Sequence, residues 1–129
     1  MKKTSLTSIL PQILSNHKEW FSSKGREGIF ADLSEENLRG ANFRNCNLVE
    51  ANLQAADLCY TDFTDADLRG ANLLEAQLKG AKLENANFEE TDLMWANLKG
   101  ASLKNTRFDG AYLQGANLQD TGIRQAQIE

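Results

Sequence analysis

The sequence predicts a repeat fold in which the chain turns a corner after every five residues. Ala or Thr stands two residues before each large apolar residue of the repeat, except at Glu36 and Cys46. A period of five fits neither the helical turn nor the two-residue alternation of a strand. We therefore predict straight sides, each pointing one large side chain into a filled core. The large residues recur in unbroken register at Leu33, Leu38, Phe43, Leu48, Leu53, Leu58, Phe63, Leu68, Leu73, Leu78, Leu83, Phe88, Leu93, Leu98, Leu103, Phe108, Leu113, Leu118, Ile123 and Ile128.

Composition limits the protein classes to which this chain can belong. Its 129 residues suit one domain, and a net charge of −4 with a pI near 5.0 argues against a general nucleic-acid binder. No run of eighteen apolar residues predicts a membrane span. The segment after Met1 is too polar for a signal peptide, so we expect a cytoplasmic protein that binds neither membranes nor nucleic acid directly.

Residues 1–30 lie outside the repeat and predict a helix from about Ser8 to Ser23. Pro11 suits the first turn of that helix, and Gly25 is a candidate C-cap. Thr4, Ser5 and Ser8 are the N-cap candidates. The helical spacing of apolar residues gives a stripe made of Leu6, Ile9, Leu10, Ile13, Leu14, His17 and Phe21, with Trp20 beside it.

Residues 31–129 resemble the pentapeptide-repeat proteins. The resemblance rests on units such as Ala41-Asn42-Phe43-Arg44-Asn45 and Ala96-Asn97-Leu98-Lys99-Gly100, and it runs without a gap. It implies an all-β solenoid, a right-handed quadrilateral β-helix with four units per coil. Twenty units then give about five coils, with residues 1–30 as an N-terminal α-helical cap and loop. The resemblance also implies a bacterial protein, of a kind typical of cyanobacteria.

Four units per coil sort the repeat into four faces, because every twentieth residue then stacks. The faces are named by their central residues. The first face has Leu33, Leu53, Leu73, Leu93 and Leu113; the second has Leu38, Leu58, Leu78, Leu98 and Leu118; the third has Phe43, Phe63, Leu83, Leu103 and Ile123; the fourth has Leu48, Leu68, Phe88, Phe108 and Ile128. We expect Phe43 to stack on Phe63, and Phe88 on Phe108.

The fifth residue of each unit is expected in a corner turn. Gly, Asn and Asp at the corners after the second and third faces predict type II turns, with a ladder of amides after the third. The corners after the first face suit a positive φ poorly, so we predict a different, squarer turn there. Those corners are Glu35, Ala55, Glu75, Trp95 and Gly115.

The stack has two open ends, which differ in what covers them. We expect the N-terminal helix to cover the first coil, with Leu10, Ile13, Leu14 and Trp20 facing Leu33, Leu38 and Phe43. The C-terminal end has no such cover in the sequence. We therefore expect a monomer or a weak end-to-end dimer through the C-terminal coil.

The sequence shows no catalytic, metal-binding or cofactor-binding constellation. His17, the sole histidine, is interpreted as a packing or capping residue rather than a catalyst. Cys46 is expected inside the core and Cys59 as a free thiol on the surface, too far apart for a disulfide. The Asp and Asn residues that precede the central Leu recur once per side, so we interpret them as structural rather than as calcium or acid–base groups.

Exposed apolar residues give the one candidate site. Leu74, Met94, Trp95 and Tyr112 are all expected on the outside of the first face, and we call them the first-face patch. Such a patch favours contact with a protein partner, which the sequence does not identify. The chain is therefore interpreted as a non-catalytic structural and interaction module.

Two alternatives belong to other functional classes. Some pentapeptide-repeat proteins mimic duplex DNA, so one alternative is an inhibitor that binds DNA gyrase. Residues 31–129 carry a net charge of −7, but outward Lys79 and Lys99 dilute the mimicry. The other alternative is an enzyme, which would need a concave pocket with perturbed titratable groups.

Overall fold

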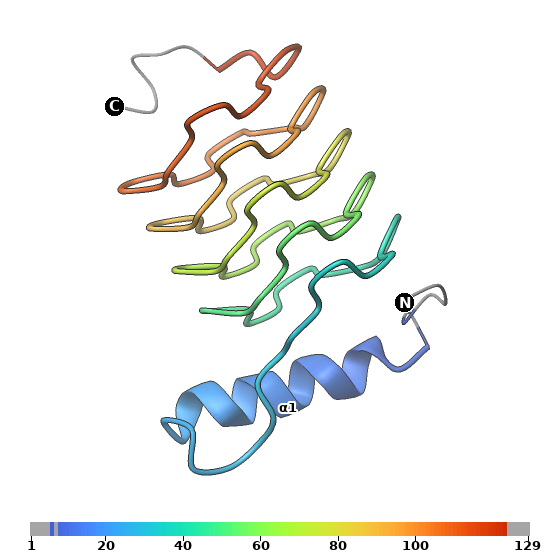
Figure 1. Ribbon diagram of the computed structural model, residues 1–129, viewed down its shortest axis with the longest axis vertical. Coiled ribbons are helices and arrows are strands. Elements are labelled where there is room, and N and C mark those ends of the chain that lie inside the picture. Colours follow the sequence, from blue (N-terminus) through green and yellow to red (C-terminus); the bar gives the residue numbers. More distant parts are fainter. Residues whose placement is uncertain (1–5, 7, 124–129) are drawn as a thin grey trace.

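The structure is a computed structural model that describes residue 6 and residues 8–123. Helix α1 (Leu10–Ser22) lies across one end of a stack of coils, and the later parts of the chain form successively higher coils (Figure 1). Each coil has narrow loops at its corners and short extended segments between them (Figure 1). The molecule is therefore a β-helix closed by a helix at its N-terminal end.

Parallel bridges fix the register of the stack. Each bridge joins the second residue of a unit to the residue twenty positions later, from Asp32 with Asn52 up to Asn97 with Asn117. Twenty residues per coil confirm four units per coil and hence the predicted faces. Residues 124–129 lie outside the described part of the chain, so the total of about five coils stays a prediction.

Three backbone hydrogen bonds recur from coil to coil along the stack. In the first coil, Leu33 N donates to Asn52 O over 2.7 Å, and Glu35 N donates to Gln54 O over 2.8 Å. In the opposite direction, Asn52 N donates to Ala31 O over 3.0 Å. Neighbouring coils exchange hydrogen bonds in this way. The backbone N–H and C=O groups of each coil therefore find their partners only when the next coil is in place.

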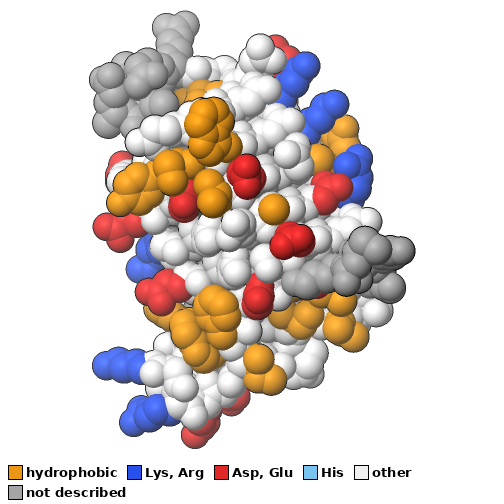
Figure 2. All heavy atoms as spheres, in the orientation of Figure 1, with side chains coloured by type: hydrophobic (Ala, Val, Ile, Leu, Met, Phe, Trp, Pro, Cys, Tyr) orange, Lys and Arg blue, Asp and Glu red, His pale blue; other side chains and the backbone are white. Residues whose placement is uncertain are grey.

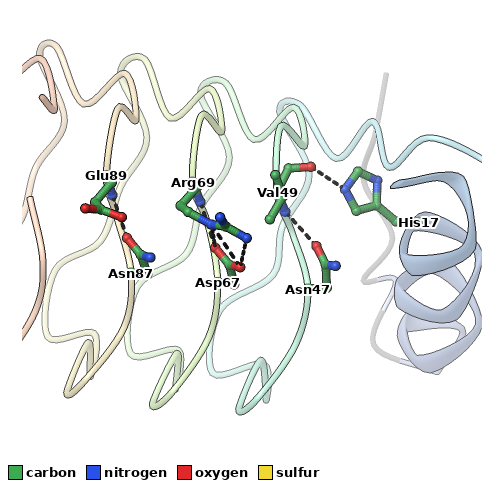
Figure 3. Close-up of polar contacts among 7 residues, drawn as sticks. All are labelled: His17, Asn47, Val49, Asp67, Arg69, Asn87 and Glu89. Carbon is green, nitrogen blue, oxygen red and sulfur yellow. Dashed lines mark hydrogen bonds and ion pairs between the residues drawn. The ribbon is translucent and has the colours of Figure 1, made fainter. Parts of the chain in front are cut away.

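Asp or Asn at the second position of a unit makes a local turn. In each case a side-chain oxygen accepts a hydrogen bond from the backbone N–H two residues later, as Asn42 Oδ1 does from Arg44 N over 3.0 Å. Figure 3 shows the same contact at Asn47 and Asn87. The structural interpretation of these residues is therefore confirmed. The residues are Asp32, Asn37, Asn42, Asn47, Asn52, Asp57, Asp62, Asp67, Asn72, Asn87, Asp92, Asn97 and Asn117.

All four edges of the β-helix use one corner geometry, and the prediction of a squarer turn after the first face is wrong. Ala55 has φ 58° and Trp95 has φ 61°, close to the φ of 61° at Asn85 after the third face. Each such residue is the third of a turn closed by an i to i+3 bond, such as Ala96 N to Leu93 O over 3.1 Å. The ladder sets this geometry, because Ala55 N must also reach Leu74 O in the next coil, over 2.9 Å. These hydrogen bonds between coils outweigh the strain of the left-handed backbone conformation, which is about 1 kcal/mol per non-glycine residue.

Leucine, phenylalanine and alanine side chains fill the interior. Phe43 and Phe63 stack with centroids 4.6 Å apart and nearly parallel rings, as predicted. Phe88 and Phe108 also lie in one column, but their rings are tilted by 42° at 5.9 Å. Inward Thr91 is fully buried and satisfies its hydroxyl by donating to Phe88 O over 2.8 Å. The core is therefore continuous through the described coils.

Helix α1 begins at Leu10, two residues after its predicted start at about Ser8. Its N-cap is Ile9, which makes no side-chain cap bond, so Ser8 is not the cap; Thr4 and Ser5 lie outside the described residues. Pro11 falls in the first turn, as predicted.

Helix α1 ends at Ser22, one residue before the predicted end at about Ser23, and its C-cap lies two residues before the predicted one. The C-cap is Ser23 rather than Gly25. Lys24 takes the left-handed conformation, with φ 58°, and its N–H donates to Phe21 O over 3.1 Å. Gly25 N donates to Trp20 O over 2.8 Å, which completes a Schellman motif.

The helix covers the first coil mainly through Leu10, Ile13 and Leu14. Leu10 is part of the buried core, and Ile13 and Leu14 pack against it. Trp20, predicted to face the same core residues, instead packs edge-on against Phe30 with centroids 4.9 Å apart. Its position on the helix lies beyond the apolar stripe, so the loop after the helix supplies its partner.

His17 joins the helix to the first coil. Its side chain is fully buried, its Nε2 lies 2.7 Å from Val49 O (Figure 3), and its Nδ1 accepts a hydrogen bond of 2.9 Å from Ala31 N. Since Nδ1 accepts, Nε2 is the donor to Val49 O. In later coils a corner N–H donates to the carbonyl at the position of Val49, as Glu50 N does to Arg69 O. The imidazole of His17 therefore replaces backbone groups that a preceding coil would provide.

Candidate protein-contact surface

The structure places all four residues of the first-face patch on the outside of the first face. Leu74 and Met94 occupy the same column one coil apart, because Ala55 N bonds Leu74 O and Glu75 N bonds Met94 O. Both side chains are half-buried. Trp95 is 65% exposed at the adjoining corner and Tyr112 is 55% exposed one coil further on. The patch therefore combines a partly covered aliphatic centre with two exposed aromatic rings.

The indole of Trp95 lies directly over Gly115, the corner of the next coil. A Cβ added to Gly115 would meet indole carbons at 2.2 and 2.5 Å, so no other residue type fits beneath the ring. Tyr60 covers Gly80 in the same way on the second face. Sequence reasoning missed that these glycines support the aromatic rings. The signal was an aromatic residue at a corner, with Gly at the corner twenty residues later. The glycine lets the ring lie against the coil, which limits the positions that the ring can adopt.

Charge is sorted by face. Among the acidic residues, Glu75 and Asp92 stand on the first face, and Glu90 occupies the corner at which the chain enters it. None of the nine Lys and Arg residues of the repeat belongs to a first-face unit. Among the described residues, they occupy the other three faces at Arg39, Arg44, Arg69, Lys79, Lys82, Lys99, Lys104 and Arg107.

Arginines neutralise several carboxylates on the other faces. Four ion pairs at 3.2 Å or less are Arg39–Asp57, Arg44–Asp62, Arg69–Asp67 and Arg107–Glu89. By contrast, Glu75, Glu90 and Asp92 form no ion pair within residues 8–123. Three carboxylates at the edges of the first-face patch therefore carry negative charge that no ion pair among the described residues neutralises.

Hydrophobic and acidic side chains share one side of the molecule. Figure 2 shows hydrophobic side chains gathered over the C-terminal coils, with red carboxylate groups among and below them. Most of the blue cationic side chains in this view lie near its edges (Figure 2). The view illustrates the mixed apolar and acidic character that the sorting of residues by face produces.

The thiols lie in environments that disfavour the thiolate. Burial raises the pKa of Cys46 to about 12. Cys59, predicted as a free surface thiol, is only 6% exposed, and burial followed by its contacts with Asp57 raises its pKa as well. Asp57 and Tyr60 flank Cys59 in the sequence. Arg39 forms an ion pair with Asp57 at 3.2 Å, and its guanidinium carbon lies 5.4 Å from the centre of the Tyr60 ring. Long neighbours in adjacent positions therefore cover a residue that points outward.

No group of three or more His, Cys, Asp or Glu side chains is placed to hold a metal ion within residues 8–123. In the same part of the chain, α1 does not have the length and apolarity that crossing a membrane requires.

Solved structures of similar proteins share this architecture. Rfr23, a pentapeptide repeat protein from the cyanobacterium Cyanothece 51142, is 38% identical with a TM-score of 0.66; the match covers 67% of this chain and 58% of that one. A pentapeptide repeat protein from the Arabidopsis thaliana thylakoid lumen is 40% identical with a TM-score of 0.72, over 75% of this chain and 68% of that one. This chain thus spans less than two thirds of the length of Rfr23.

A more distant likeness concerns the fold alone. QnrB1, a plasmid-mediated fluoroquinolone resistance protein, is 18% identical with a TM-score of 0.62, over 77% of this chain and 52% of that one. Comparison with curated proteins gave no significant match.

A family model supplies the identification. The model described as pentapeptide repeats matches residues 29–58, 37–73, 71–94 and 91–126, in eight copies. These segments span most of the chain and coincide with the bridged coils. Proteins of this kind form right-handed β-helices, in agreement with the stacked coils seen here. By its unbroken five-residue register, its twenty-residue coil and this match, the chain belongs to the pentapeptide-repeat family.

Proposed function

We propose that this protein is a non-catalytic interaction module that binds a partner protein through the first-face patch. The observation that carries the proposal is the exposed Trp95, held against Gly115, beside half-buried Leu74 and Met94. Tryptophan and tyrosine are enriched among the residues that dominate binding energy at interfaces. Side chains attached to a hydrogen-bonded ladder lose little conformational entropy on binding, which favours affinity.

The surroundings of its nucleophilic side chains support a role other than catalysis. Both ring nitrogens of His17 are engaged in hydrogen bonds that hold the helix to the first coil. Cys46 and Cys59 both have raised pKa values, which keeps their thiols protonated at neutral pH. These groups serve packing in the geometry described, so binding is the function that the structure supports best.

The test compares capture of partners by the wild-type protein and by two variants. The patch variant carries Leu74→Gln, Met94→Gln and Trp95→Ala, and the control carries Tyr60→Ala, which removes the other aromatic ring that covers a glycine. In extracts of the native cell, we expect a specific partner to be retained by wild type and control and lost from the patch variant. The loss should correspond to at least about thirtyfold in affinity, as for an interface hot spot. Equal retention by all three proteins would contradict the proposal.

Binding to DNA gyrase as a mimic of duplex DNA has less support. Arginine pairing neutralises part of the acidic surface on three faces, for example at Asp57, Asp62 and Glu89. A mimic of duplex DNA would present regular negative charge around its length. Lack of inhibition in a supercoiling assay at micromolar protein would exclude this alternative.

The cytoplasmic location also remains part of the proposal. Cell fractionation with an antibody to the protein would test it. The expected monomer or weak end-to-end dimer involves residues 124–129, which lie outside the described part of the chain. Its test is the mass of the protein in solution over a range of concentrations.

A further inference from the structure

The first face differs from the other three faces in both charge and apolar character. Its aliphatic centre is Leu74 and Met94, and its aromatic side chains are Trp95 and Tyr112. No Lys or Arg of the repeat belongs to it. A partner that covers this centre therefore meets negative charge on its rim and no positive charge from the same face.

Two corner side chains frame the unit at residues 111–115. Glu90 leans toward Gly110, since a Cβ added there would lie 3.2 Å from Glu90 Cγ. Trp95 covers Gly115 at the other end of the same unit. Tyr112, between them, bridges to Asp92 in the coil below. A carboxylate and an indole thus stand at opposite edges of the first face, with Tyr112 between.

The three rim carboxylates are available to a partner. Glu75 and Glu90 are exposed corner residues, and Asp92 is half-buried with its Oδ1 accepting a hydrogen bond from Met94 N. None of the three forms an ion pair within residues 8–123. The remaining carboxylate oxygens can accept hydrogen bonds from ammonium or guanidinium groups. The indole of Trp95, which covers Gly115 with one side, is 65% exposed and can take a cation over its open ring face.

We propose that the first face binds a cationic peptide segment of a partner protein whose apolar side chains alternate with Lys or Arg. The apolar side chains cover Leu74 and Met94, and the cations contact Glu75, Glu90 and Asp92 and lie over Trp95. This inference rests on the proposed function and adds the chemistry of the partner. Charge complementarity carries it, because the apolar centre alone would accept partners of either sign.

The experiment selects peptides without assuming a sequence. A library of random twelve-residue peptides displayed on phage is selected on the immobilised wild-type protein. Peptides that also bind the Leu74→Gln, Met94→Gln, Trp95→Ala variant are discarded. We expect the remaining peptides to be enriched in Lys and Arg over the library and to contain apolar residues between them.

The charge requirement is then measured with one selected peptide made by synthesis. The charge variant carries Glu75→Gln, Glu90→Gln and Asp92→Asn; Asn occupies the position of Asp92 in the neighbouring units, so its turn is kept. Its affinity for the peptide should fall about tenfold at low salt, the sum of three exposed ion pairs. A control with Asp65→Asn, Glu84→Gln and Asp120→Asn, on other faces, should stay within about twofold of wild type.

The outcomes separate this inference from the proposed function. Selected peptides without enrichment in Lys and Arg, or an unchanged affinity of the charge variant, would overturn the cationic partner and leave the patch as a binding site. If no selected peptide distinguishes wild type from the patch variant, the first face is not a binding site and both proposals fail. A fall in affinity that is equal in the charge variant and in the control would show a general effect of net charge and would also overturn the inference.

Discussion

His17 shows how one side chain can complete the end of a repeat. In all later coils, the backbone groups equivalent to Val49 O and Ala31 N are satisfied by neighbouring turns. The first coil has no coil before it. The imidazole instead accepts a hydrogen bond from Ala31 N and donates one to Val49 O at the same time. This requires the neutral ring, because a protonated Nδ1 would no longer accept from Ala31 N.

Stability should therefore depend on pH through His17. Burial lowers the pKa of His17 below its ordinary value of 6.5, against weaker raising effects of its bond to Val49 and of Glu50. As pH falls below 6.5, the unfolded chain binds the proton more readily than the folded chain, whose His17 has the lower pKa, so stability falls as pH falls. We expect the free energy of unfolding in urea to decrease between pH 7.5 and pH 5.5, by at most about 1.4 kcal/mol per pH unit. The decrease should be smaller in His17→Gln; identical slopes for both proteins would contradict this role.

Glycine under Trp95 gives a second prediction at the residue scale. Gly115→Ala adds backbone strain at φ 75° and a Cβ that collides with the indole, whereas Gly100→Ala adds similar strain at φ 72° with open space around the Cβ. We expect Gly100→Ala to lower the free energy of unfolding by about 1 kcal/mol and Gly115→Ala to lower it by more. Urea unfolding measures both. In a Trp95→Ala background the two substitutions should cost the same, and a difference that persists there would show that the indole is not the cause.

At the scale of the single unit, inward and outward positions have opposite requirements. Leu73 is fully buried in the core, and the next residue, Leu74, points outward. We predict that Leu73→Asp abolishes folding, because a carboxylate at the core of the stack has no water or partner. Leu74→Asp should retain the β-helix. Thermal melting followed by circular dichroism tests the pair, and a Leu73→Asp protein that melts like wild type would contradict the assignment of the core.

The sequence was sufficient to predict the units and the role of the Asp and Asn residues, and the four faces followed once the resemblance to the pentapeptide-repeat proteins implied four units per coil. These follow from positions that repeat, so each coil supplies the same information again. The conformations of Glu35 and Ala55 were not predictable from propensity, because the ladder bond of a corner N–H decides its φ and individual preference does not. The burial of Cys59 was missed for a similar reason. It depends on Arg39 in the coil below, which bonds Asp57.

The candidate patch was predicted as a set of positions, and its function is still a proposal. The column of Leu74 and Met94 follows from the twenty-residue register alone. The placement of Trp95 over Gly115 required coordinates, because the sequence does not tell which way a corner side chain leans. Nothing in the repeat itself identifies a partner, since the same core pattern supports any outward residues.

For the whole molecule, nearest-neighbour stacking predicts a gradient of local stability. Leu73 N donates to Asp92 O over 2.8 Å in the middle of the stack. Within residues 8–123, neither Leu113 N nor Leu118 N donates a hydrogen bond to a backbone carbonyl of a neighbouring coil. At the other end, α1 covers the first coil through Leu10.

We therefore expect native-state hydrogen exchange to be slowest at Leu73 and its neighbours and fastest at Leu113 and Leu118. Amides of the first coil, such as Leu33, should exchange more slowly than those of the last coil because the helix covers them. Mass spectrometry of exchanged peptides would measure the gradient. Uniform protection from the first coil to the last would instead indicate that the β-helix opens only as a single unit.

The constant register makes chain length a determinant of where surfaces lie. Twenty residues added within the repeat would duplicate a coil and leave every later side chain on its own face. Five residues added between Leu74 and Met94 would keep the apolar residues inside, yet rotate everything that follows by a quarter turn. Met94, Trp95 and Tyr112 would then move to the second face and leave Leu74 behind. Insertions and deletions of single units thus offer evolution a way to dismantle or build a binding surface while the core remains intact.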